Sequence, residues 1–366
     1  MHTNDNAIDN SAEDIRQQVA AAIETKTPLH ICAGNSKAFY GNKIEAQVIN
    51  VADHCGIIEY QPSELVVTVR SGTRLNDLQA ELKDNNQMLA FEPPIHNENT
   101  TIGGVIACGL SGPGCAAFGS ARDFVLGTTI INGKAEKLKF GGQVMKNVAG
   151  YDASRLMVGA QGTLGILLDI SIKVLPVKEI EKTLKISAEL NDAIHRLQQW
   201  IKIGLPITAS CYFKGTLYLR LGSTRSAIQK TVETINKQFS SEEIDADFWL
   251  QLKNQTHEFF SAKPTADSRN LWRCSHQTAT ELYGDTDNQL LEWNGALRWL
   301  VSDGDLHNKA AELGGHATRY PISDYGNNTP DIFQPLQPGI LKIHQRLKQA
   351  FDPDKLLNPN RLYTGL

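Results

Sequence analysis

The sequence predicts an α+β protein of two domains, and three observations support this prediction. The chain has 366 residues, more than a single hydrophobic core usually organises. Residues 101–165 contain 14 of the 29 glycines, placed around short runs rich in Val and Ile. After Pro176 glycine becomes rarer and helical periodicity appears. We therefore expect a first domain over residues 1–176, a second over residues 177–320, and a C-terminal segment over residues 321–366.

Composition and charge exclude several classes of protein. A net charge of −4 argues against a nucleic-acid partner, which would need a basic face. No run approaches the roughly 18 apolar residues of a membrane helix, so we expect no integral membrane segment. The polar N-terminus MHTNDNAIDNSAED lacks the features of a secretory signal, which favours a cytoplasmic protein. The six cysteines are scattered without a Cys-x-x-Cys pair, which predicts reduced thiols and no bound metal.

The chain is expected to open with an amphipathic helix and a short strand. Ser11 with Asp14 fits a capping box, and Ile15, Val19 and Ile23 recur at helical spacing. The alternating segment PLHICA then predicts a strand that leads directly into a polar loop.

This loop, AGNSKAFYG, is the first candidate for ligand binding. Gly34, Asn35, Ser36 and Lys37 follow one another in a tight turn, where successive backbone N–H groups can converge on an anion. A Rossmann dinucleotide fingerprint is the alternative interpretation. However, Gly34 and Gly41 do not give Gly-x-Gly-x-x-Gly and no long apolar helix follows, so we prefer the anion nest.

The next segment predicts three strands, QVINVA, GIIEY and LVVTV, followed by a helix. Thr73 is the expected N-cap of this helix, and Leu75, Leu78 and Leu82 share one of its faces. The N–H groups of residues 71–73 offer a second contact for a ligand, although a capped helix explains them equally well.

The glycine-rich stretch is predicted to bind a long polar ligand along the backbone. Pro93 and Pro94 hold the chain extended just before it. Two glycine loops, TIGGVIACGLSGPG and MVGAQGTLG, then flank the strand FVLGTTIING, with small hydroxyl side chains between the glycines. A loop-rich β region whose glycines only form turns is the alternative, and the order of loops and strands favours the binding site.

Charged residues within this stretch allow two interpretations. Arg122 and Asp123 form a structural ion pair, which we favour, or Arg122 faces the ligand. In the segment MKNVAGYDASRL, Asp152 is the expected cap of a short helix, and Lys146 and Tyr151 are weaker candidates for ligand contact.

The second domain is predicted to contain a ferredoxin-like βαββαβ unit. The strand KTLKISA precedes a helix capped by Asn191, and a hairpin follows around Lys214 and Gly215. A second helix with Ile228 on its apolar face and a strand near IDADFWL complete the unit.

Three further strands are expected at LWRCSH, WNGALRWLV and GGHATRY. Arg273 and Arg298 stand beside tryptophans in the first two, and a guanidinium held against aromatic rings can bind a small carboxylate. Stacked Arg–Trp pairs are also ordinary packing. His316 is a candidate base, although a lone histidine on a strand is more often a structural group.

The segments RDFVLGTTIING, LKFGGQVMKNVAGYDASRLMVGAQGTLGIL and ISIKVLP resemble a known family. They are similar to the FAD-binding E subunits of bacterial glycolate oxidase, which belong to the FAD-linked oxidases of the vanillyl-alcohol-oxidase or PCMH type. The resemblance implies a PCMH-type FAD-binding domain of two α/β subdomains, with the ferredoxin-like unit as a cap. It also implies that residues 321–366, with their Asp-Pro and Asn-Pro turns, return to the FAD domain.

The resemblance further implies a set of cofactor-binding residues and a mode of binding. Several members attach FAD covalently through a histidine in the turn that matches AGNSKAFYG, and this turn has none, so we expect non-covalent FAD. The expected FAD-binding residues are Ala33, Gly34, Asn35, Ser36, Lys37, Pro94, Thr101, Ile102, Gly103, Gly104, Ala107, Gly109, Ser111, Gly112, Ser120, Arg122, Asp123, Gly159, Gly162, Thr163, Gly165, Ile166 and Asn358.

The function implied is that of an FAD-binding subunit in a glycolate, or 2-hydroxy acid, oxidase complex. Such a subunit would work with a catalytic flavin subunit and an iron–sulfur subunit, which could hold it at the inner membrane, while glycolate is oxidised to glyoxylate. This chain lacks the His-x-His motif of the catalytic members. A stand-alone FAD-dependent oxidoreductase that uses Arg273, Arg298 and His316 remains open, as does a scaffold subunit without catalysis.

Overall fold

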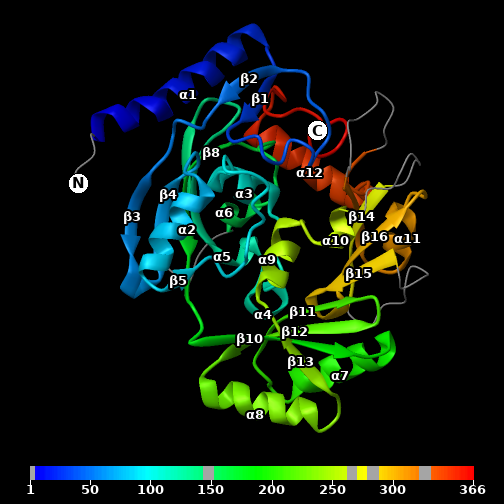
Figure 1. Ribbon diagram of the computed structural model, residues 1–366. Coiled ribbons are helices and arrows are strands. Elements are labelled where there is room, and N and C mark those ends of the chain that lie inside the picture. The colour runs from blue at the N-terminus through cyan, green and yellow to red at the C-terminus, as the bar shows by residue number, and fades with distance from the viewer. Residues whose placement is uncertain (1–4, 143–151, 262–269, 278–287, 321–330) are drawn as a thin grey trace.

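The computed structural model describes residues 5–142, 152–261, 270–277, 288–320 and 331–366, and it has the predicted mixture of helices and sheets (Figure 1). The first domain, blue to teal in Figure 1, lies at the upper left. An eight-stranded sheet extends from the green elements at the bottom to the orange strands at the right. The change from one sheet system to the other falls between residues 176 and 180. The exact domain limits stay a prediction.

The first domain is organised around an antiparallel five-stranded sheet. Its strand order is β3-β4-β8-β6-β7. The helices α2 and α3 pack on this sheet through apolar side chains such as Leu78 and Ile106, both fully buried. The elements are β3 (Ile57–Gln61), η1 (Pro62–Glu64), β4 (Val66–Arg70), α2 (Leu75–Asp84), α3 (Ile102–Cys108), α4 (Cys115–Phe118), α5 (Ala121–Phe124), β6 (Val125–Ile131), β7 (Lys137–Gly141), α6 (Ala153–Leu156) and β8 (Ile166–Lys173), with β5 (Gln87–Met88) paired to β9 (Leu175–Pro176).

A second core joins the N-terminal elements to the same sheet. The helix α1 (Asp5–Thr25) and the parallel pair β1 (Leu29–Cys32) and β2 (Gln47–Asn50) contribute Ile15, Val19 and Ile49, which pack with residues of β6 and β8. The helix begins six residues earlier than its predicted cap. Ser11 therefore does not cap it, and its Oγ instead hydrogen-bonds His54 Nδ1 at 2.8 Å, which ties the helix to the sheet.

The second domain contains the predicted βαββαβ unit. Its four strands have the order β13-β10-β12-β11, which is the ferredoxin-like order, and the same sheet continues through β15-β16-β14-β17. The hairpin turns at Lys214 and Gly215, both with positive φ, as predicted. The elements are β10 (Ile180–Ser187), α7 (Leu190–Lys202), β11 (Ile207–Phe213), β12 (Thr216–Ser223), α8 (Arg225–Asn236), β13 (Ser241–Ile244), α9 (Asp247–Asn254), α10 (Glu258–Ser261), β14 (Asn270–Ser275), β15 (Gln289–Glu292), η3 (Trp293–Gly295), β16 (Leu297–Ser302), α11 (His307–Glu312) and β17 (His316–Tyr320).

Several predicted element limits were wrong by a few residues. The strand near IDADFWL ends at Ile244, because Asp245 and Asp247 start a helical turn and Trp249 packs from α9 into the core. The segment WNGALRWLV begins as a short 3₁₀ turn, so only its second half is a strand. The helix α7 follows Glu189, two residues before the predicted cap Asn191.

An ion pair and a hydrogen bond at the glycine-rich loop help to fasten the cap to the first domain. Arg220 on β12 forms an ion pair with Glu92 at 2.7 Å, and the other oxygen of Glu92 accepts a hydrogen bond from the N–H of Gly114. Trp293 Nε1 donates a hydrogen bond to the carbonyl of Gly112 at 2.9 Å. The glycine-rich loop at residues 112–114 is therefore held directly by the cap.

The C-terminal segment returns to the first domain, as the resemblance implied. The helix α12 (Pro338–Phe351) is followed by a turn that places Leu357 beside Leu29 of β1 (Figure 1). The N–H of Leu29 donates a hydrogen bond to the carbonyl of Leu356 at 2.7 Å. Among the helices that the structure describes, none combines the length and the hydrophobicity that crossing a bilayer would take.

Candidate functional site

A cavity lies between β1 with its following loop, α3, and the glycine loop that precedes β8. It encloses about 790 Å³ of space outside the protein atoms, part of it open to solvent. A neighbouring cavity shares Ala33, Gly34 and Thr101 with it, so the space is extended. The predicted site residues that line the first cavity are Ala33, Gly34, Asn35, Ser36, Lys37, Thr101, Gly103, Gly104, Ala107, Gly162, Gly165 and Asn358.

The loop at residues 34–37 has the geometry of an anion nest. None of its four backbone N–H groups makes a hydrogen bond to another described residue, and Asn35 has a φ of 51°. The loop packs closely on the backbone of Asn99, since a Cβ at Gly34 would lie 1.5 Å from the carbonyl oxygen of that residue. Unpaired N–H groups at the wall of a cavity attract a negatively charged ligand.

Buried polar side chains in the same cavity also lack partners. Lys37 is 6 % exposed, and its Nζ has no hydrogen-bond partner among the described residues. Burial lowers the pKa of Lys37, and the neighbouring Cys108 partly opposes this effect. Ser71 Oγ and Gln161 Nε2 are likewise buried and unpaired. No Asp or Glu stands among the described residues that line this cavity. These donors suit the pyrophosphate and hydroxyl groups of a dinucleotide such as FAD, because buried polar atoms require partners.

The turn before α2 does not offer the N–H groups that the sequence suggested. The N–H groups of Ser71, Gly72 and Thr73 all donate to backbone carbonyls, and Thr73 Oγ1 hydrogen-bonds Gly56 instead of capping the helix. The N–H of Gly103 is also occupied, by the carbonyl of Ser71 at 2.7 Å. Gly103 is needed there for close approach, since a Cβ would lie 2.7 Å from Ser71 Cβ.

Other predicted FAD-binding residues lie outside the lining of this cavity. Asp123 Oδ2 accepts hydrogen bonds from Ser120 N and Oγ, both at 2.8 Å, so a capping box fixes the loop where we expected an Arg122–Asp123 ion pair. Arg122, Gly159 and Thr163 line a different cavity beside α12. The remaining residues outside the lining are Pro94, Ile102, Gly109, Ser111, Gly112 and Ile166. Lys146 and Tyr151 fall outside the residues that the structure describes, whereas Asp152 caps α6 as predicted.

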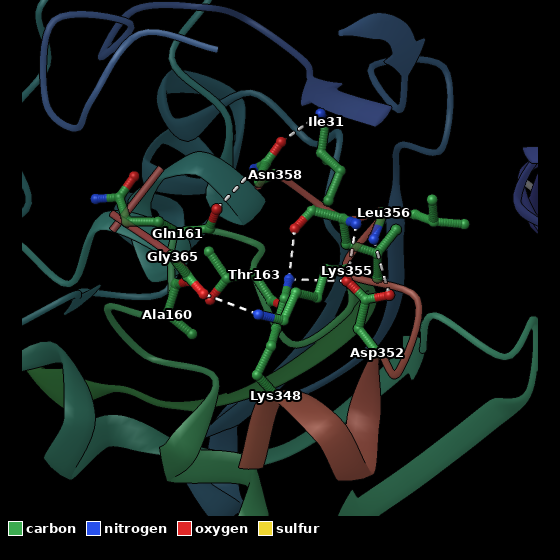
Figure 2. Close-up of polar contacts among 11 residues, drawn as sticks. Ile31, Ala160, Gln161, Thr163, Lys348, Asp352, Lys355, Leu356, Asn358 and Gly365 are labelled. Carbon is green, nitrogen blue, oxygen red and sulfur yellow. Dashed lines mark hydrogen bonds and ion pairs between the residues drawn. The ribbon is translucent and has the colours of Figure 1, made fainter. Parts of the chain in front are cut away.

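Asn358 connects the C-terminal segment to both sides of the cavity. Its Oδ1 accepts a hydrogen bond from the N–H of Ile31 at 2.8 Å, and its Nδ2 donates to the carbonyl of Gln161 at 2.7 Å (Figure 2). Asn358 therefore holds β1 and the glycine loop at a fixed separation. Residues His30, Cys32 and Cys108 also line the cavity and were not predicted, because nothing in their local sequence marks them as ligand contacts.

The three candidate catalytic residues do not form one cluster. In the strand register Arg273 stands opposite Trp299, whereas Arg298 stands opposite Cys274. Since neighbouring residues of a strand point to opposite faces, the two arginines lie on opposite sides of the sheet and cannot hold one small carboxylate together. His316 pairs with Ser275, so it shares the face of Arg273 but is an exposed residue.

Arg273 is the candidate whose surroundings suit an anion. Its guanidinium lies 5.0 Å from the ring of Trp293 and 5.8 Å from that of Trp299. The residue is 8 % exposed, so its charge is largely removed from solvent. A buried cation is costly unless an opposite charge compensates it, so an anionic ligand would stabilise Arg273.

Glu292 adds an unexpected carboxyl group near Arg273. Its Oε1 accepts a hydrogen bond from Trp299 Nε1 at 2.9 Å, and the residue is 4 % exposed. Burial raises its pKa to about 7, although the hydrogen bond from Trp299 and the charge of Arg273 partly oppose the shift. This carboxyl group therefore changes its charge near neutral pH.

Replacing Glu292 with Gln should stabilise the protein above neutral pH. The folded-state pKa lies above the ordinary value of 4.5, so the stabilising contribution of the protonated form is complete below about pH 4.5 and disappears as the pH rises through about 7. Gln retains the acceptor for Trp299 and cannot ionise. We expect a gain on the order of 3 kcal/mol at about pH 8.5 and little change at about pH 4.5. Urea unfolding at both pH values measures the gain, and an equal gain at both would contradict the assignment.

Comparison with known proteins agrees with the geometry of the cavity. Residues 8–141 match the family model described as FAD binding domain. The chain is 43 % identical over 358 residues to glycolate oxidase subunit GlcE of Escherichia coli (strain K12), covering 97 % of this chain and 98 % of that protein. It is 29 % identical over 194 residues to a D-lactate dehydrogenase of Anaerostipes hadrus, covering 52 % of this chain and 40 % of that protein.

Solved structures support the same fold. The chain superposes on p-cresol methylhydroxylase with a TM-score of 0.67 at 12 % identity, covering 96 % of this chain and 87 % of that one. For 4-ethylphenol oxidase from Gulosibacter chungangensis the TM-score is 0.66 at 13 % identity, with 97 % and 88 % covered. Both neighbours have the PCMH-type architecture that the resemblance implied. The chain therefore belongs to the family of FAD-dependent oxidoreductase subunits that includes the glycolate oxidase subunit GlcE, and its cofactor is FAD.

Proposed function

We propose that this chain is the FAD-binding subunit of a glycolate oxidase complex that oxidises glycolate, a 2-hydroxy acid, to glyoxylate. The observation that carries the proposal is the cavity with four unpaired N–H groups, the buried unpaired Lys37 and no lining carboxylate. The match to GlcE over nearly the whole of both chains supports the assignment to glycolate oxidation. The proposed partners are a catalytic flavin subunit and an iron–sulfur subunit, which receives the electrons.

The residues of the nest and Lys37 would hold the pyrophosphate of FAD in this cavity. Ser71 Oγ and Gln161 Nε2 are free to hydrogen-bond other polar groups of the cofactor. Bound FAD supplies the two-electron redox chemistry. The protein supplies charge, fixed N–H groups and a space bounded by α3 and the glycine loop, which together orient the cofactor. We also propose that binding is non-covalent, because residues 34–41 contain no histidine.

Arg273 is the residue that we assign to the substrate carboxylate. Its guanidinium is held between two tryptophan rings on the face of the cap sheet that packs toward Tyr40 of the first domain. The described residues contain no group of three His, Cys, Asp or Glu side chains that could bind a metal ion. A partner subunit would therefore supply the metal and base that the catalytic members use.

The function is tested by purifying the natively expressed chain with whatever accompanies it. We expect a yellow protein that releases its flavin on acid precipitation, and mass spectrometry should identify a second flavin subunit and an iron–sulfur subunit. Glycolate should bleach the flavin only when these partners are present. Bleaching of the isolated chain would favour the stand-alone oxidoreductase, for which the buried Arg273 is the supporting observation. A colourless protein that binds no added FAD would leave only the scaffold.

The role of Arg273 predicts a large loss of carboxylate binding on substitution. Arg273→Met should weaken binding of oxalate, a small unreactive dicarboxylate, by about 2–5 kcal/mol, because the buried counter-charge is removed. Titration of the fluorescence of Trp293 and Trp299 measures the affinity. Arg225→Met, which changes an exposed arginine at the start of α8, is the matched control. Unchanged oxalate affinity in Arg273→Met would refute the assignment.

A further inference from the structure

Arg361, near the end of the chain, binds the carbonyl side of the loop that forms the anion nest. The residue is buried, and its guanidinium donates to five carbonyl groups of the loop backbone. Nη1 donates to the carbonyls of Gly41 at 3.2 Å and Asn42 at 2.8 Å. Nη2 donates to the carbonyls of Lys37 at 3.4 Å, Ala38 at 2.8 Å and Tyr40 at 3.1 Å. This interaction was not predicted.

The position of Arg361 explains why the N–H groups of the nest remain available. Five carbonyl groups between residues 37 and 42 accept hydrogen bonds from the guanidinium, so these acceptors do not take up the N–H groups of residues 34–37. A guanidinium with several donors in one plane can orient several carbonyls at once, which a single ammonium cannot do. Arg361 thus helps to fix a loop conformation in which the N–H groups of the cavity-lining residues 34–37 have no backbone partner.

Arg361 is itself held in place by backbone contacts. Its N–H donates to the carbonyl of Asn358 at 3.2 Å, and its carbonyl accepts from the N–H of Asn42 at 2.9 Å. Gly41 leaves room for the guanidinium, because a Cβ there would lie 2.5 Å from Arg361 Nε. The loop and the C-terminal segment are therefore fitted to each other.

We propose that Arg361 is a positioning residue for the FAD pyrophosphate, acting through the backbone of the loop at residues 34–42. The proposal rests on the FAD site proposed above and adds a residue that acts from outside the nest. Its guanidinium borders the cavity and donates to five loop carbonyls, so it contributes through the geometry of the loop in addition to its charge. Lys37 supplies the positive charge that the anion meets.

The test compares Arg361→Lys with the wild type in deflavinated protein. Arg361→Lys keeps the charge but cannot bind five carbonyls, so we expect the Kd for FAD and the Kd for ADP to rise at least about tenfold, the factor that corresponds to ~1.4 kcal/mol. ADP reports on the pyrophosphate site without the flavin ring. The stabilisation of the melting temperature by saturating FAD should fall, while the melting temperature of the apoprotein changes less. Arg346→Met, an exposed arginine on α12, is the control.

A second variant tests the same contact from the other side. Gly41→Ala should displace the guanidinium and strain the loop, because a Cβ there would lie 2.5 Å from Arg361 Nε and the residue has a φ of 133°, so both Kd values should rise. Equal FAD and ADP affinities in Arg361→Lys and wild type would overturn the proposal. If Arg361→Lys does not fold, wild-type affinities in a folded Gly41→Ala protein would overturn it instead. Wild-type protein that binds neither FAD nor ADP would instead refute the proposed function.

Discussion

Lys348→Met is expected to lower the free energy of unfolding by about 3–5 kcal/mol, since it leaves a buried carboxylate without its partner. Lys348 and Asp352 are 2 % and 0 % exposed, and Nζ lies 2.8 Å from Asp352 Oδ2. Nζ also donates to the carbonyls of Thr163 and Leu357, both at 2.8 Å (Figure 2). One ammonium therefore joins α12, the glycine loop and the C-terminal turn.

The surroundings of this ion pair explain the size of the effect. Asp352 also accepts hydrogen bonds from the N–H groups of Leu356 and Leu357, so it cannot turn to solvent when the lysine is lost. Burial lowers the pKa of Lys348, and Asp352 opposes this by favouring the charged form. Urea unfolding measures the loss, with the exposed Lys342→Met on the same helix as control. A loss below about 1 kcal/mol, as for a surface pair, would mean that the contacts do not stabilise the fold.

Gly34→Ala should abolish FAD binding at cofactor concentrations that saturate the wild type. The new methyl group would lie 1.5 Å from the carbonyl oxygen of Asn99, and a backbone oxygen cannot move aside as a side chain can. The loop must shift, which separates the four N–H groups that form the nest. We expect the Kd for FAD to rise by at least about 100-fold, which corresponds to ~2.8 kcal/mol.

This prediction is measured by the quenching of flavin fluorescence when FAD is added to apoprotein. Gly339→Ala is the matched control, because a Cβ at that position meets nothing within 4 Å. Circular dichroism of both variants establishes that the fold is retained. Wild-type FAD affinity in a folded Gly34→Ala protein would show that the loop at residues 34–37 is not the anchor of the cofactor.

The sequence was sufficient to predict features that depend on neighbouring residues. The nest at residues 34–37 is one tight turn, so four contiguous residues were enough to predict it. The hairpin at Lys214 and Gly215 and the cap at Asp152 are local in the same way. The predicted limits of the elements were less accurate. For example, α1 begins before Ser11, and Ser11 contacts the distant His54, which a local capping pattern cannot predict.

Features that join distant parts of the chain could not be predicted. Arg361 binds backbone carbonyls more than 300 residues away in the sequence. Every residue has a backbone carbonyl, so no pattern of side chains predicts this contact. Each arginine lies close to a tryptophan in the sequence, so the sequence does not distinguish Arg273 from Arg298. Only the strand register shows that the two lie on opposite faces of the sheet. Ser71 and Gln161 became candidates only when their buried atoms proved unpaired.

The contact of β1 with the C-terminal turn has a consequence for biosynthesis. Ile31 and Arg361 both border the cavity, although more than 300 residues of chain separate them, so Arg361 leaves the ribosome long after Ile31. Contacts of such long sequence separation form late and slowly in folding. A nascent chain that has not yet reached residue 361 therefore lacks one side of this cavity, and a ligand that needs the complete cavity can bind only after this segment has been synthesised.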